Sequence, residues 1–187
     1  KTLESEIEEL VDKGGPPKCN WDQVGKIFYH DYVDEYTDSV MNQVDHEVIR
    51  EKGLSVALDL GNGAAVFTAP VLASKLGCKV YTINAEIDGE FLGRGSEPTP
   101  SNLTDLKNLI KATDADLGIG FDGDGDRSII IDENAEAVWG DKTLSLVAQE
   151  YLKEHPGETI VTAISSSPSL EKVVSRYDGK VHWTKVG

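Results

Sequence analysis

The sequence LGIGFDGDGDRSIII, residues 117–131, constrains the fold of this chain more strongly than any other segment. Its apolar parts, 117–121 and 129–131, predict two strands, and the acidic centre, 122–127, predicts a tight turn between them. The centre places a carboxylate at every second position on a backbone that two glycines keep small. Carboxylates this close repel one another unless a cation lies between them. We therefore predict a cation site on a rigid frame of strands.

The predicted ligands are Asp122, Asp124 and Asp126, and the predicted ion is Mg²⁺. Mg²⁺ seeks octahedral oxygen coordination and commonly keeps positions for water and a phosphate oxygen. Three aspartates that each bind through one oxygen leave such positions free. The adjacent Arg127 is always charged and is predicted to hold a phosphate against the metal. This chemistry indicates phosphoryl handling, with electrostatic stabilisation as the contribution of the site.

Three alternatives remain open for this segment. With Asp122 as the first position of a calcium loop, Glu133 falls at the twelfth, which is a partial EF-hand match, but Arg127 replaces the invariant glycine and the flanks are β-rich. A haloacid-dehalogenase-like phosphatase needs a second aspartate two residues after its nucleophile, a spacing that Asp122 and Asp124 meet. The downstream lysine and acids of that class cannot be placed here. The third alternative is a solvated turn without any cation.

Composition limits the classes of partner. The chain has 187 residues, with 33 acidic and 18 basic side chains and a net charge of −15. This balance argues against nucleic acid or an anionic membrane surface as the main partner. The sequence has no apolar run that could span a bilayer and no signal-peptide pattern, and Cys19 and Cys78 lack metal-type spacing. We expect an intracellular, cytoplasmic protein.

One structural unit occurs twice along the chain. The order strand, turn, helix, strand is predicted at residues 54–60, 61–63, 66–76 and 79–83, and again at 159–164, 165–168, 170–177 and 180–184. Such units form parallel strand pairs through right-handed crossovers. The predicted fold class is α/β, with two successive three-layer α/β/α domains whose sheets are mixed and largely parallel, the second one incomplete.

A further helix is predicted between the two units. The segment EPTPS, residues 97–101, makes a rigid lead, and Ser101 is the predicted N-cap. Leu103, Leu106 and Ile110 follow at helical spacing and form its apolar face.

Two other motifs resemble functional sites but favour plain structural roles. The Gly-Asn-Gly turn at 61–63 follows a strand and opens a helix, but Val66 stands where a dinucleotide fingerprint has its third glycine. The serines at 165–167 lack a Gly-x-Ser-x-Gly frame and a His/Asp pair, so N-capping of the next helix is favoured over a nucleophilic role.

The first 50 residues have a different pattern. A helix is predicted for residues 3–11, and the Gly-Gly-Pro-Pro sequence at 14–17 stops it. A second helix is predicted for residues 29–49. Its apolar side chains lie on one side and are Tyr32, Val33, Tyr36, Val40 and Val44. Two interpretations stay open: the trailing edge of a missing domain plus a connector, or a helical arm that packs on the domain that follows.

Six short motifs resemble those of the α-D-phosphohexomutase superfamily, which comprises phosphomannomutase, phosphoglucomutase and phosphoglucosamine mutase enzymes. They occur in family order and are LDLGNG at 58–63, EPTP at 97–100, ADLG at 115–118, DGDGDR at 122–127, GDK at 140–142 and TKVG at 184–187. The resemblance covers the chain from about Glu6 to its last residue. The DGDGDR element is highly specific in this company, whereas each of the others alone is weak.

The resemblance implies a four-domain isomerase of carbohydrate metabolism. A phosphoserine of its first domain donates a phosphoryl group to a hexose phosphate, and the bisphosphorylated sugar reorients and returns the other one. Phosphate thereby moves between O1 and O6. The implied Mg²⁺ ligands are Asp122, Asp124, Asp126 and a phosphoserine oxygen, and Arg127 helps to bind the phosphoryl group. Lys185, in the Thr-x-Val-Gly stretch, is predicted to contact substrate.

The chain also departs from the superfamily pattern. It contains no Ser-His-Asn-Pro phosphoserine loop, no amino-terminal basic residues for proton transfer and no Gly-Glu-x-Ser/Asn-Gly sugar loop. We predict that residues 1–50 are the tail of the first domain and a connector, 51–138 the second domain and 139–187 the first part of the third. The expected partners are a hexose phosphate and the phosphoserine loop of the missing first domain. Alone, the chain is expected to be inactive and to self-associate through an exposed strand edge.

Overall fold

The computed structural model describes residues 2–15 and 18–186, which divide into two units between Tyr32 and Val33. The first unit contains helix α1 (Thr2–Asp12) and a short 3₁₀ turn, η1 (Trp21–Gln23). The helix predicted for residues 3–11 is confirmed, and it ends where Gly14 adopts a positive φ of 94°. The two prolines of the predicted stop signal lie outside the described residues.

Two helices, α2 (Val33–Met41) and α3 (His46–Lys52), open the second unit. The prediction of one helix over residues 29–49 was wrong. A new helix starts after Asp45 because its carboxylate accepts a hydrogen bond from the Val48 N–H at 3.3 Å, which caps α3. Helix α3 ends at Gly53, which has a left-handed φ of 58°.

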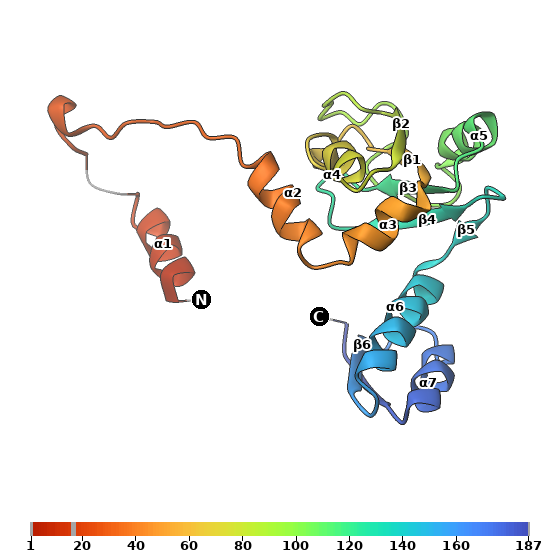
Figure 1. The fold of residues 1–187 in the computed structure, drawn as a ribbon. Coiled ribbons are helices and arrows are strands. Elements are labelled where there is room, and N and C mark those ends of the chain that lie inside the picture. Colours follow the sequence, from red (N-terminus) through yellow and green to blue (C-terminus); the bar gives the residue numbers. More distant parts are fainter. Residues whose placement is uncertain (1, 16–17, 187) are drawn as a thin grey trace. The chain divides into compact units, whose positions relative to one another are not determined.

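A five-stranded mixed sheet forms the centre of the second unit (Figure 1), in the strand order β2-β1-β3-β4-β5. Its strands are β1 (Ser55–Asp59), β2 (Lys79–Ile83), β3 (Leu117–Phe121), β4 (Ser128–Asp132) and β5 (Ala137–Val138). Strand β1 pairs in parallel with β2 and β3, whereas β3 with β4 and β4 with β5 are antiparallel. The two strands predicted around the acidic turn are confirmed as the β3–β4 hairpin.

Helices cover both faces of this sheet. Successive side chains of β1 point to opposite faces, so neighbouring residues pack against different helices. Leu58 belongs to the core cluster that contains residues of α4 (Ala69–Lys75). Its neighbour Ala57 faces the other way, into a cluster with Leu106 of α5 (Thr104–Thr113). The three-layer arrangement that the sequence predicts is therefore present around this sheet.

The helix predicted for residues 66–76 is shorter than expected. A 3₁₀ turn, η2 (Ala64–Val66), comes first, and α4 begins at Ala69. Pro70 explains the late start, because a residue without an N–H is tolerated only in the first helical turn. Gly77 follows the helix with a φ of 80°, as expected for a residue just beyond a helix C-terminus.

The start of α5 also differs from the prediction, because Leu103 and not Ser101 occupies the N-cap position. Ser101 lies instead in a turn that the Asn102 N–H closes by donating to the Thr99 carbonyl at 3.0 Å. Proline at position 100 suits such a turn. Because Ser101 takes part in this turn, the helix begins only after it. The predicted apolar face is confirmed, since all three of its residues are buried.

A second, parallel sheet of two strands follows in the chain. Its elements are β6 (Thr159–Ala163), β7 (Lys180–Thr184), α6 (Gly140–Glu154), α7 (Ser169–Val174) and the 3₁₀ turn η3 (Ser175–Tyr177). Leu152 of α6 and Leu170 of α7 are buried in one core cluster that includes Ile160 and Val181 of the sheet. The predicted α/β class, with mixed and largely parallel sheets, is confirmed.

Candidate metal centre

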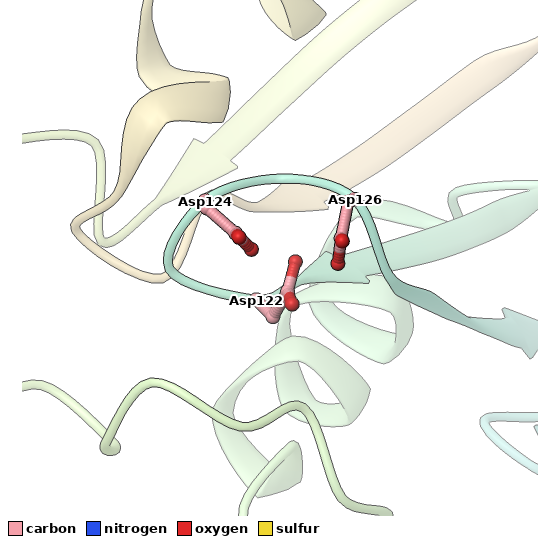
Figure 2. Close-up of side chains that lie close together, drawn as sticks. All are labelled: Asp122, Asp124 and Asp126. Carbon is pink, nitrogen blue, oxygen red and sulfur yellow. The ribbon is translucent and has the colours of Figure 1, made fainter. Parts of the chain in front are cut away.

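The β3–β4 hairpin brings the three predicted ligands together. One carboxylate oxygen each of Asp122, Asp124 and Asp126 lies within 4.8 Å of the other two. Figure 2 shows the three side chains pointing toward one another inside the loop. Asp122 is buried, at 1 % exposure, whereas the other two side chains are exposed. The loop therefore presents one fixed carboxylate and two that solvent can reach.

The spacing of these oxygens suits a hard divalent cation. Two oxygens on opposite sides of Mg²⁺ lie about 4.2 Å apart, because each is about 2.1 Å from the ion. The corresponding limit for Ca²⁺ is about 5 Å. Three carboxylate oxygens that all lie within 4.8 Å of one another are close enough to bind either ion together after small side-chain rotations. The three aspartates thus fit the predicted Mg²⁺, and measured affinities for Mg²⁺ and Ca²⁺ are needed to decide between the two ions.

The EF-hand alternative is wrong. The acidic loop joins two antiparallel strands, whose pairing continues to Phe121 and Ser128 on either side of it. An EF-hand loop joins two helices instead.

Arg127 lies against the candidate ligands, and its predicted contact with a phosphate stays a prediction. Its backbone N–H donates to Asp122 Oδ1 at 3.0 Å, and its Nε donates to Asp122 Oδ2 at 2.8 Å. Its Nη1 donates to the Glu97 carboxylate at 2.8 Å, which brings the EPTP motif to the acidic loop. The Arg127 side chain is 63 % exposed, so a ligand from solvent can reach the guanidinium.

The pKa values of Asp122 and Asp126 are shifted in opposite directions. Burial raises the pKa of Asp122, but hydrogen bonds from the backbone and side chain of Arg127 outweigh it and hold that pKa below its usual range. The charge of Asp124 is the main cause that raises the pKa of Asp126. The hydrogen bond to Asp122 raises the pKa of Arg127. A divalent cation between the carboxylates would relieve their mutual repulsion.

The Gly-Asn-Gly turn and the residue that follows it contact the acidic loop. The Ala64 N–H donates to the Gly123 carbonyl at 2.9 Å. A side chain at position 63 has no room, because a Cβ added to Gly63 would lie 2.2 Å from the Gly123 oxygen. This turn therefore packs closely on the acidic loop.

Sequence reasoning missed a buried ion pair behind the loop. Arg94 Nε lies 2.7 Å from Asp59 Oδ2, and both side chains are buried. Asp59 Oδ1 also accepts hydrogen bonds from the Gly61 N–H at 3.1 Å and from Asn84 Nδ2 at 2.9 Å. A carboxylate at the end of a buried apolar strand was the available signal, because a buried charge needs a partner. No local pattern identified that partner.

Two further predicted residues lie elsewhere. Lys185 follows β7 directly and is exposed, and its contact with substrate stays a prediction. Ser167 Oγ accepts a hydrogen bond from the Ser169 N–H at 3.3 Å at the start of α7, although Pro168 occupies the N-cap position. The prediction that the serine cluster caps this helix was wrong, because α7 has no side-chain hydrogen bond at its N-cap.

The fold and the loop define an α/β protein with a candidate divalent-cation centre beside an accessible arginine. Two family descriptions cover this fold: "Phosphoglucomutase/phosphomannomutase, alpha/beta/alpha domain II" matches residues 34–137, and domain III of the same family matches 139–187. The chain belongs to the phosphoglucomutase/phosphomannomutase family. The resemblance to the phosphohexomutase superfamily is thereby confirmed, while the domain boundaries predicted from the sequence stay predictions.

Individual relatives agree with this family. The chain is 39 % identical to a phosphoglucomutase/phosphomannomutase of Thermococcus kodakarensis, over 100 % of this chain and 41 % of that protein. It is 38 % identical to a phosphoglucosamine/phosphogalactosamine mutase of Sulfurisphaera tokodaii, over 98 % and 41 %. A crystal structure of a phosphoglucomutase/phosphomannomutase family protein from Burkholderia thailandensis superposes with a TM-score of 0.82 at 28 % identity, covering 100 % of this chain and 39 % of that one.

The chain thus spans about two fifths of the length of these relatives. In the part of the chain that the structure describes, none of the helices has the length and apolar character needed to cross a membrane.

Proposed function

We propose that this chain is the metal-binding part of a phosphosugar mutase, an isomerase that interconverts hexose 1-phosphate and hexose 6-phosphate. The observation that carries the proposal is the cluster of three carboxylate oxygens within 4.8 Å of one another, with Arg127 hydrogen-bonded to the buried one. Membership in the phosphoglucomutase/phosphomannomutase family supports it.

Each residue of the loop has a proposed role. Asp122, Asp124 and Asp126 hold Mg²⁺, which when bound supplies positive charge that stabilises a phosphoryl group during transfer. The buried Asp122 fixes the position of the site, and the exposed pair completes it from the solvent side. Arg127 binds an oxygen of the same phosphoryl group, because its guanidinium is both adjacent to the ligands and accessible.

The complete reaction needs groups from outside this chain. A phosphoserine from another domain donates the phosphoryl group, and a bisphosphorylated sugar reorients before it returns one. The names of two relatives refer to glucose, mannose, glucosamine and galactosamine phosphates, and a third relative, from Thermococcus kodakarensis, is a phosphopentomutase. The names therefore do not select one sugar, and a hexose phosphate is the proposed substrate class. Lys185 is proposed to contact that sugar phosphate.

Titration calorimetry with Mg²⁺ tests the site. The chain should bind one Mg²⁺, and Asp124→Asn should weaken binding by about tenfold or more, because it replaces an anionic ligand. Asp178→Asn is the matched control. It removes the same charge from the C-cap residue of η3, outside the acidic loop, and should leave the Mg²⁺ affinity unchanged. Equal Mg²⁺ affinity of the wild type and Asp124→Asn, or Ca²⁺ affinity above that for Mg²⁺, would contradict the proposal.

The 187-residue chain is predicted to have no mutase activity by itself, because it lacks the phosphoserine loop. A coupled assay with glucose 1-phosphate or mannose 1-phosphate checks this. Turnover above the blank would refute the requirement for a second domain.

A further inference from the structure

The positively charged guanidinium of Arg94 is buried next to the acidic loop. The Arg94 side chain is 5 % exposed and that of Asp59 is 1 % exposed, so their ion pair is removed from solvent. Besides its bond to Asp59, Arg94 donates through Nη2 to the carbonyl oxygen of Phe121. Phe121 is the last residue of β3, and the next residue in the chain is the buried ligand Asp122. The guanidinium thus joins the end of β1 to the start of the acidic loop.

The segment that contains Arg94, residues 94–97, also contacts the acidic loop at its other end, next to Arg127. Three residues after Arg94, Glu97 accepts a hydrogen bond from Arg127, which directly follows the last candidate ligand. Asn102 Nδ2 donates to the carbonyl oxygens of both Arg94, at 3.2 Å, and Glu97, at 2.7 Å, and so holds the segment in shape. Residues 94–97 therefore contact the acidic loop immediately before its first carboxylate and immediately after its last one.

The packing around Arg94 leaves little freedom to this arrangement. A Cβ added to Gly61 would lie 2.7 Å from Arg94 Nη2 and 2.9 Å from the Phe121 oxygen. The guanidinium is a planar fork with fixed angles between its N–H groups, so two simultaneous acceptors determine each other's position. Any shift of the Asp59 carboxylate is thus transmitted to the Phe121 carbonyl.

A buried ion pair is weak evidence for stability, because its desolvation cost offsets most of the attraction. A geometric role explains its presence better. Mg²⁺ demands near-ideal octahedral geometry at about 2.0–2.1 Å, whereas Ca²⁺ tolerates flexible coordination at about 2.3–2.6 Å. A loop that prefers Mg²⁺ must therefore hold its three carboxylate oxygens, which lie within 4.8 Å of one another, at the shorter distances that the smaller ion needs.

We propose that Arg94 is a positioning residue for the metal loop: through the Phe121 carbonyl and the ion pair with Asp59, it sets the carboxylate geometry that selects Mg²⁺ over Ca²⁺. Arg94 touches neither the ion nor the substrate. This proposal rests on the proposed function, because it assumes that the loop binds a divalent cation.

The test compares Mg²⁺ and Ca²⁺ affinities by calorimetry in the wild type and in Arg94→Lys, with urea unfolding of each protein. Lysine keeps the positive charge but has no fork that reaches both acceptors. Arg94→Lys should lose about tenfold or more in Mg²⁺ affinity, as is typical for groups that orient metal ligands. Ca²⁺ affinity should change less, so that the Mg²⁺/Ca²⁺ affinity ratio falls.

Two further variants separate positioning from stability. Ile110→Ala removes buried volume from α5 in the same unit, so it should lower stability while leaving the affinity ratio unchanged. Asp59→Asn/Arg94→Met removes both charges and leaves neither unpaired, so it should fold even if Arg94→Lys does not. It should still show the lower Mg²⁺/Ca²⁺ ratio.

The outcomes distinguish the two proposals. If Asp124→Asn abolishes Mg²⁺ binding but the Arg94 variants keep the wild-type ratio, the positioning role is wrong and the metal site stands. If the Ile110→Ala control shifts the ratio as much as the Arg94 variants do, the effect follows from stability and the positioning role is again wrong. If the wild type binds no Mg²⁺, both proposals fail.

Discussion

Arg127 and Asp122 are joined by two hydrogen bonds: the arginine backbone N–H reaches Oδ1 at 3.0 Å and its Nε reaches Oδ2 at 2.8 Å. The residue predicted to bind a phosphoryl group therefore also pairs with a predicted metal ligand. A cation that binds Asp122 competes with this guanidinium for the carboxylate. Occupation of the metal site would free Nε for an incoming anion, which couples the two binding events.

Arg127→Gln should separate these events. Mg²⁺ affinity should rise, because the competing positive charge is removed. Binding of inorganic phosphate to the Mg²⁺-saturated chain should fall about tenfold, which corresponds to the loss of one charge-assisted hydrogen bond of about 1.5 kcal/mol. Calorimetry at constant ionic strength measures both. Arg176→Gln, outside the hairpin, is the control, and loss of Mg²⁺ affinity with unchanged phosphate binding would contradict the coupling.

Ionisation of the Asp116 carboxyl group should make the free energy of unfolding depend on pH. Its Oδ2 accepts from the Ser55 N–H at 2.7 Å and from the Ser55 hydroxyl at 2.8 Å, and the backbone hydrogen bond is the main cause that lowers its pKa from 3.8. A carboxyl whose pKa is depressed in the folded state stabilises it above the unfolded value, and this contribution is lost as the pH falls through the folded-state pKa.

Asp116→Asn should therefore unfold at lower urea concentration than the wild type at neutral pH. The difference should shrink as the pH is lowered below 3.8. Ser55→Ala, which removes one donor, should show a smaller difference of the same pH dependence. A difference between wild type and Asp116→Asn that stays constant across this range would show that the carboxylate charge is not responsible.

Gly63→Ala should disturb the acidic loop through steric overlap. The new Cβ would lie 2.2 Å from the Gly123 oxygen, so the loop backbone must move. We expect a loss of about 1–3 kcal/mol in the free energy of unfolding, as for other overpacked sites, together with weaker Mg²⁺ binding. Gly89→Ala is the control, because nothing lies within 4 Å of its added Cβ. Urea unfolding that does not separate the two variants would refute the close contact.

The exposed apolar side chains of the second sheet should promote self-association. Val161 of β6 is 62 % exposed and Ile164, which follows it, is 73 % exposed. Sedimentation equilibrium should show a mass that rises with concentration, and Val161→Lys/Ile164→Lys should reduce it. Leu92→Lys changes an even more exposed residue, which is 82 % exposed and lies outside this sheet, and it should not reduce the mass. A strictly monomeric wild type at high concentration would contradict the expectation.

The acidic hairpin could be predicted from the sequence because everything that forms it is local. Two apolar runs flank a short Asp/Gly turn, so strand, turn and ligand spacing all follow from neighbours in the chain. The same holds for β2 and β7, whose observed bounds equal the predicted ones. The prediction of one helix over residues 29–49 failed in part because Asp45 caps a separate helix, α3, within that segment.

What holds the hairpin in place required the three-dimensional structure. Arg94 and Asp59 are 35 residues apart, and Arg127 and Glu97 are 30 residues apart. These pairs meet because the segment between β2 and α5, which contains Arg94 and Glu97, contacts the ends of β1 and β3, and these two strands are adjacent in the sheet. Local periodicity contains no information about which distant loops such an arrangement brings together. The amino-acid sequence alone therefore specified the candidate ligands and the turn that carries them. Only the tertiary structure, through the order of strands in the sheet, decided that the buried Arg94 contacts this turn.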